Sequence, residues 1–111
     1  MQNIEKDIVF FEDVKSLSAV PDKIYKVIHA DEISMDVVGE GSFEIQVLGQ
    51  VVPGGPFRPK QVLSEADYSI SSAITNEGFY RIDITGLNAY KVIVNSLEGH
   101  ITYCKGKEIE G

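Results

Sequence analysis

Three side chains in this sequence, His29, His100 and Cys104, are of the types that bind transition metals. His100 and Cys104 are four residues apart, a spacing that brings two ligands to one metal ion on a helix. The surrounding sequence favours a strand, in which residues four apart share a face but lie about 13 Å from each other, at roughly 3.3 Å per residue. We therefore expect no metal site, with His100 at a strand end and Cys104 acting as a small, half-buried hydrophobic residue.

The nearest approach to a catalytic motif is Gly39-Glu40-Gly41-Ser42-Phe43. It lacks the final glycine of the nucleophile elbow, which also needs a strand-to-helix turn, and it lacks the lysine of a phosphate-binding loop. Asp31 and Glu32 are adjacent, so they do not face each other across a sugar as glycosidase carboxylates do. The acidic loop leaves weak calcium binding open. We predict no catalytic residues and no cofactor, and we expect that the protein is not an enzyme.

The segment Val52–Lys60 carries the residues best suited to contact a partner. Its three prolines cannot donate to a sheet ladder and its two glycines add flexibility, so it is expected to be a loop. Phe57 and Arg58, at its tip, pair an aromatic ring with a planar cation, which are residue types enriched at binding hot spots. Phe57 and Arg58 are therefore the candidate partner contacts. The preferred interpretation, however, is a long connection in which Phe57 folds back onto the edge of a sheet.

The five tyrosines offer a second possible binding surface, because exposed aromatic rings can form a platform for sugars. Strand alternation instead places Tyr80, Tyr90 and Tyr103 among aliphatic residues, where their rings would contribute to the core. The core is the preferred interpretation.

Composition and charge limit the classes of partner. The chain has 111 residues, of which 43% are hydrophobic, as expected for a single domain spanning 1–111 with its own core. The formal net charge is −7, and residues 1–50 hold ten acids but only four bases. This charge repels phosphate backbones and anionic lipids, so we expect no nucleic-acid and no membrane partner.

The expected location follows from cysteine usage and the first residues. A lone Cys104 cannot form an internal disulfide, so no oxidising compartment is required. The stretch from Met1 to Asp7 lacks a basic segment followed by an apolar run, so no secretory signal peptide is expected. We expect the protein to be made in a cytoplasm and kept there, or assembled there into something larger.

The dominant hydrophobic period is two, which is typical of half-buried strands. It is clearest in Ser42–Val47 and Phe79–Thr85, and it places Tyr80, Ile82 and Ile84 on one face. The same reasoning predicts strands in the following segments: Ile24–Ala30, Ile33–Val38, Ala89–Asn95 and a last strand in which Ile101 and Tyr103 share a face. Phe11–Ala19 and Leu63–Tyr68 are ambiguous, and either could contain a helical turn.

Glycines punctuate these strands at short intervals. Gly39–Gly41 is expected to form a hairpin turn, and Glu98-Gly99 is expected to join the last two strands. About eight short strands with such close turns predict an all-β fold, an antiparallel, jelly-roll-like β-sandwich. Residues 1–6 and 107–111 are the expected frayed ends.

The second half of the chain carries a specific arrangement of strands and turns. It reads Ile74-Thr75-Asn76-Glu77-Gly78-Phe79-Tyr80-Arg81-Ile82-Asp83-Ile84-Thr85-Gly86, then Tyr90–Val94, then Gly99-His100-Ile101-Thr102. With the upstream stretch Gly41–Gly49, this pattern resembles small virion-associated structural proteins of phages and prophages, including those of Bacillus-type hosts. The resemblance covers residues 33–106. The Pro-rich loop departs from the family pattern, which puts a loop-based binding role in doubt.

The resemblance implies a non-enzymatic structural or accessory component that assembles through protein–protein contacts, as a homo-oligomer. It implies a location in the host cytoplasm before assembly and in the virion afterwards. It does not assign the protein to capsid, tail or baseplate. The alternative is a carbohydrate- or peptide-binding β-sandwich module that uses the loop at 52–60, with a surface glycan as a further candidate ligand.

Overall fold

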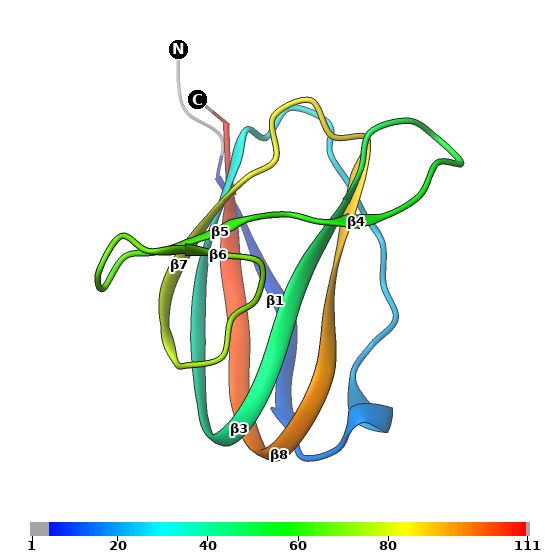
Figure 1. The fold of residues 1–111 in the computed structure, drawn as a ribbon. Coiled ribbons are helices and arrows are strands. Elements are labelled where there is room, and N and C mark those ends of the chain that lie inside the picture. Colours follow the sequence, from blue (N-terminus) through cyan, green and yellow to red (C-terminus); the bar gives the residue numbers. More distant parts are fainter. Residues whose placement is uncertain (1–4, 111) are drawn as a thin grey trace.

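The structure, a computed structural model, describes residues 5–110, and these form an all-β chain with a single 3-10 turn, η1 (Figure 1). The elements are β1 (Glu5–Val14), η1 (Leu17–Ala19), β2 (Tyr25–Lys26), β3 (Glu32–Gln50), β4 (Arg58–Pro59), β5 (Val62–Ser64), β6 (Ile70–Ser71), β7 (Gly78–Asp83) and β8 (Ala89–Ile109). One antiparallel sheet contains all eight strands in the order β1-β8-β3-β7-β5-β6, with β2 on β8 and β4 on β3. The predicted all-β antiparallel class is confirmed.

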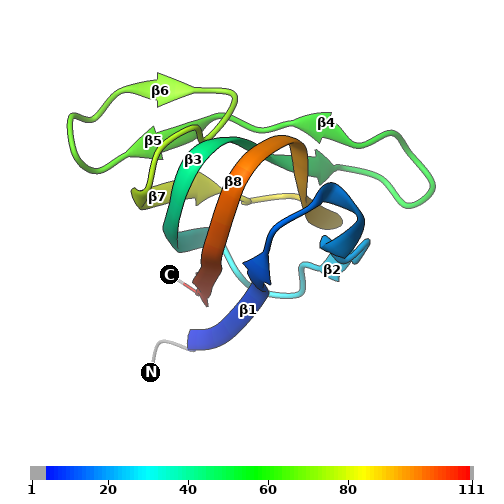
Figure 2. The same ribbon diagram turned by 90° about the horizontal axis from the view of Figure 1, so that it is seen from below.

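Two long strands turn this single sheet into two layers. β3 and β8 have 19 and 21 residues and pair with each other along almost their whole lengths. Both bend at the same level, so that each strand passes from one layer into the other (Figures 1 and 2). β1 and β7 extend the first layer and β2 and β4 the second, and the side chains between the layers form the core.

The expectation of short strands is wrong for β3 and β8, and so is the hairpin at Gly39–Gly41. The glycines do mark a reversal of chain direction, but Gly39, Glu40 and Gly41 pair with Ile101, His100 and Gly99 rather than closing a turn. Gly41 has a φ of 82° and Gly99 one of 154°, values that side chains rarely allow. β3 and β8 pass so closely here that a Cβ on Gly41 would lie 2.8 Å from the Cα of Gly99. We call this shared bend the glycine corner.

The predicted alternation is confirmed in the middle of the strands. Tyr80, Ile82 and Ile84 are all buried on one face, and so are the core residues of β3. The alternation fails after the glycine corner, because the pairing of β3 with β8 shifts between Val38 and Gly39 and leaves Thr102 as an extra residue. Ile101 is consequently buried, while Tyr103 turns to the other face and donates a hydrogen bond to Asp36 Oδ2 at 2.8 Å. The expected core position of Tyr103 is therefore wrong.

Two further segments differ from expectation. Ile24–Ala30 contains only the two-residue strand β2, and it exposes Ile24 and Ile28 instead of burying both faces. Of the expected frayed ends, residues 1–4 and Gly111 lie outside the described residues. Lys6 pairs with Glu108, and Lys107 pairs with both Asp7 and Ser34, so the described parts of both ends belong to the sheet.

Candidate protein-contact site

The loop that carries Phe57 connects β3 to β4 and is anchored at its base. Arg58 and Pro59 form β4, so the loop is shorter than the expected Val52–Lys60 and Arg58 does not lie at its tip. The Gln50 side chain is buried, donates a hydrogen bond to the Gly55 carbonyl at 2.9 Å and accepts one from Asn88 at 2.7 Å. A tight turn from Val52 to Gly55 closes the loop. The fixed base gives the loop a defined shape, with Val51 and Val52 exposed on its surface.

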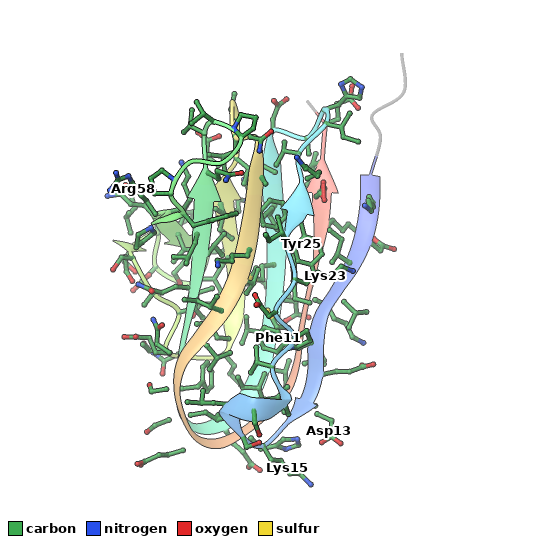
Figure 3. The ribbon with its side chains drawn as sticks, turned by 90° about the vertical axis from the view of Figure 1, so that its right-hand side faces the viewer. Phe11, Asp13, Lys15, Lys23, Tyr25 and Arg58 are labelled. Carbon is green, nitrogen blue, oxygen red and sulfur yellow. The ribbon has the colours of Figure 1, made fainter. Side chains whose placement is uncertain are left out.

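Phe57 and Arg58 are held differently. The Phe57 ring is half-buried, and the Lys91 ammonium group lies 4.7 Å from its centroid, as in a cation–π contact. Arg58 is exposed, and its backbone pairs with Gly49 at the start of β4 (Figure 3). Arg58 is therefore free to meet a partner, whereas Phe57 presents only part of its ring. Their role as partner contacts stays a prediction.

A cluster of aromatic rings lies where β1, β2 and β8 meet. Phe10 packs edge-on against Tyr25 and Tyr90, with centroids 5.3 Å and 6.4 Å away, and the two tyrosines stack at 5.2 Å. Phe10 reaches this position because the pairing of β1 with β8 shifts between Val9 and Phe11. The rings fix β2 to the body of the protein even though β2 has only two residues.

Tyr90 is fully buried and donates a hydrogen bond from its hydroxyl to Glu108 Oε2 at 3.1 Å. Burial, followed by the nearby Glu108 carboxyl group, raises the pKa of Tyr90 well above its ordinary value. Tyr25 also has a raised pKa, chiefly because its phenol is partly desolvated. Tyr90 therefore acts as a neutral hydrogen-bond donor inside the sandwich.

An open groove of about 390 Å³ runs beside this aromatic cluster, between β1 and the segment that contains β2 (Figure 3). We call it the β1/β2 groove. Its lining residues are Lys6, Asp7, Ile8, Val9, Lys23, Ile24, Tyr25, Lys26 and Ile28. Three of these nine are lysines, in a protein with a formal net charge of −7.

A larger depression, of about 460 Å³, lies on the outer face of the first layer. Val9, Lys105, Asp36 and Phe79 follow one another across β1, β8, β3 and β7 in the pairing register, so they form one row on this face. Val9 and Phe79 are 52% and 62% exposed, which gives the row an apolar residue at each end. Lys105 and Asp36, one base and one acid, lie between them, and such a mixed surface selects no single sign of partner charge.

The residues considered for metal chemistry are separated by the fold. His100 lies 2.7 Å from Asp13 Oδ1 at the glycine corner, whereas Cys104 is fully buried in the core. Burial, with a smaller contribution from Asp36, raises the pKa of the Cys104 thiol. Within residues 5–110, no group of three or more His, Cys, Asp or Glu side chains is placed to hold a metal ion. The same residues contain no helix with the length and hydropathy needed to span a membrane.

Sequence reasoning missed the β1/β2 groove. Lys6, Lys23 and Lys26 are visible as the early bases of an acidic half, but they are separated by up to 20 positions. The exposure of Ile24 and Ile28 could not be predicted, because both residues fit the pattern of a buried strand. An unusual density of lysine and isoleucine between residues 23 and 28 is the one local signal that could have pointed to this surface.

The chain shares its two-layer antiparallel β-sandwich fold with two prophage proteins of known structure, which confirms the expected resemblance at the level of the fold. The crystal structure of the SPBc2 prophage-derived protein YomS is similar with a TM-score of 0.84 and 23% sequence identity, over 99% of this chain and 96% of that one. The crystal structure of the PBSX exported protein XepA is similar with a TM-score of 0.81 and 18% identity, over 99% of this chain but only 39% of that one. No family model and no curated protein sequence matches the chain.

Proposed function

We propose that this protein is a non-enzymatic structural or accessory component of a phage or prophage particle, and that it acts as a homo-oligomer through protein–protein contacts. The observation that carries the proposal is the likeness to YomS, because it extends over nearly the full length of both chains. A separate prophage protein thus consists of little more than this fold. The likeness to part of XepA supports the same origin.

Surface features agree with a role in assembly. Val51, Val52, Ile28, Ile70 and Phe79 each expose more than half of their side-chain surface. Apolar side chains exposed to this extent at several places are suited to contacts with other subunits. The net charge of −7 disfavours non-specific association of free subunits, and it disfavours nucleic acid and anionic membranes as partners.

The location that follows is the host cytoplasm before assembly and the virion afterwards. The name of XepA describes that protein as exported. For the present chain, incorporation into particles would bring it out of the cell, since a particle leaves the cell with its components.

The proposal predicts a defined oligomer in solution and the presence of the protein in purified particles. Size-exclusion chromatography with light scattering should give a mass that is a fixed multiple of 12.2 kDa. Mass spectrometry of particles purified after prophage induction should detect the chain at a stoichiometry above that of host proteins. A monomer at every concentration, together with absence from the particles, would refute the proposal.

The exposed loop gives a prediction for the candidate contacts. If Phe57 and Arg58 contact a neighbouring subunit, the variant Phe57→Ala/Arg58→Ala should shift the oligomer to smaller species. The dissociation constant of the oligomer should rise at least about tenfold. Tyr68→Ala is the matched control, because Tyr68 is 76% exposed in a different turn. An unchanged mass for the double variant would remove both residues from the subunit interface. Loss of binding to a glycan array without loss of mass would favour the alternative, a carbohydrate-binding module.

A further inference from the structure

The β1/β2 groove follows the edge of a strand and not its face. Lys6, Asp7, Ile8 and Val9 are consecutive, and all four line the groove. Consecutive residues of a strand point to opposite faces, so a depression that touches all four must run beside the backbone. Lys23–Lys26 line the opposite wall in the same consecutive way.

β1 offers this edge for pairing. Among the described residues, β1 pairs with β8 alone, and it is the first strand in the order of the sheet. Alternate N–H and C=O groups of an edge strand point away from the sheet, where another strand can bond to them. The register shift at Phe10 ends the regular pairing of β1 with β8. The part of the edge that can accept another strand is therefore Lys6–Val9, which borders the groove.

The charge around this edge is opposite to that of the whole protein. Lys6, Lys23 and Lys26 are exposed at the groove, and Asp7 is the only acid in its lining. The Lys23 ammonium group lies 5.0 Å from the centroid of the Tyr25 ring, so its side chain follows the groove wall. The adjoining cavity of about 180 Å³ includes Lys6 and Lys26 together with Glu108 and Glu110, so the excess of positive charge belongs to the groove itself. A ligand with negative charges fits this surface.

The groove also offers apolar contacts at two sides. Val9 is 52% exposed on β1, while Ile24 and Ile28 are 54% and 78% exposed on the opposite wall. A strand that pairs with β1 presents its side chains alternately to its two faces, so apolar and acidic residues in alternation would meet the isoleucines and the lysines, respectively.

We propose that the β1/β2 groove binds an extended acidic segment of a different protein, which adds to β1 as a further strand. The inference rests on the proposed function, since it names the chemistry of one partner in an assembly. The partner segment alternates Asp or Glu with aliphatic residues over about four to six positions, a length set by the regular part of β1.

The structure favours this occupant over a second copy of the chain. Between Lys26 and Arg58 the chain has no base and holds its longest run of acids. Glu32 and Asp36, which belong to this run, lie on β3 between β8 and β7, so this acidic strand is already paired on both edges. A lipid surface fits less well, because acyl chains cannot bond to the backbone groups of β1.

The experiment uses the full chain to select binders from a random ten-residue peptide library displayed on yeast. The groove variant Lys6→Glu/Lys23→Glu/Lys26→Glu is compared with the matched control Lys15→Glu/Lys60→Glu/Arg81→Glu, which has the same net charge and changes no residue of the groove. All three groove lysines are exposed, so the first variant should keep the fold, and circular dichroism checks this. Selected peptides should alternate acidic and aliphatic residues and should bind the groove variant at least about tenfold more weakly than the control.

Hydrogen exchange gives the second measurement. A selected peptide should slow the exchange of alternate amides from Lys6 to Val9, as strand addition requires. No selected peptides, peptides without acidic bias, or equal binding to both variants would overturn the proposal. Dissociation of an oligomer by the groove variant would identify a second copy as the occupant, and lysine-dependent binding to phosphatidylserine vesicles without peptide binding would identify a membrane. A defined oligomer that selects no peptides would refute the groove alone and leave the proposed function standing.

Discussion

Replacement of Gly41 by alanine is expected to lower the free energy of unfolding by at least about 3 kcal/mol. The φ of 82° at Gly41 alone costs an alanine about 1–2 kcal/mol. In addition, the new Cβ would collide with the Glu98 carbonyl oxygen and lie 2.8 Å from the Cα of Gly99. These are backbone atoms of the partner strand, so relief requires that β3 and β8 separate at the glycine corner. Urea denaturation followed by circular dichroism measures the loss.

Gly86→Ala is a closely matched control for this substitution. Gly86 has a φ of 80°, almost the same as that of Gly41, but a Cβ there would have no atom within 4 Å. The free energy of unfolding of Gly86→Ala should therefore fall only by the backbone cost of about 1–2 kcal/mol. The difference between the two variants isolates the close approach of the strands. Equal losses would show that the corner does not depend on that approach.

The glycine corner also shows where sequence reasoning ends. The positions of Gly39–Gly41 and Gly99 correctly indicated that the chain changes direction there. A hairpin turn and a bend shared by two strands both require glycine, so local sequence cannot distinguish them. The deciding fact is the pairing of Gly41 with Gly99, residues 58 positions apart, and such pairing is set by the packing of the two layers.

The candidate site was less predictable than the fold for a related reason. Alternation placed Tyr80 and Tyr90 in the core correctly, because both lie in regular strand segments. Register shifts at Phe10 and near Thr102 reverse the faces of the residues beyond them, and neither shift has a distinctive residue type. These shifts place Phe10 under the β1/β2 groove and move Tyr103 out of the core.

Alkaline pH is expected to destabilise the protein steeply. Tyr90 and Cys104 are both fully buried, and burial raises the pKa of each well above its ordinary value of 10.0 or 9.0. A raised pKa means that the folded chain keeps a proton that the unfolded chain releases. The resulting stability is complete below the ordinary pKa and is lost as the pH rises above it.

Tyr25, Tyr80 and Tyr103 also have raised pKa values, but the shifts of Tyr90 and Cys104 are the largest, and these two groups contribute two retained protons to the slope of the unfolding free energy against pH. Each lowers the free energy of unfolding by about 1.4 kcal/mol per pH unit, so the pair lowers it by about 2.7 kcal/mol per unit above pH 10. Two units remove roughly 5 kcal/mol, which is comparable with the whole stability of a small domain. The protein should therefore unfold cooperatively near pH 12, as measured by urea midpoints at a series of pH values.

Single substitutions assign this slope to its two groups. Tyr90→Phe and Cys104→Ala should each reduce the slope above pH 10 by about 1.4 kcal/mol per pH unit, although both lower the stability at neutral pH through the lost hydrogen bond to Glu108 or the lost thiol packing. Tyr68→Phe removes the same hydroxyl group from a side chain that is 76% exposed, and it serves as the matched control substitution. If the free energy of unfolding of Tyr90→Phe falls with pH as steeply as that of the unchanged protein, the folded protein must release the Tyr90 proton as readily as the unfolded chain does. That result would require water to reach the phenol, and it would place an opening of the sandwich at the aromatic cluster beside the β1/β2 groove.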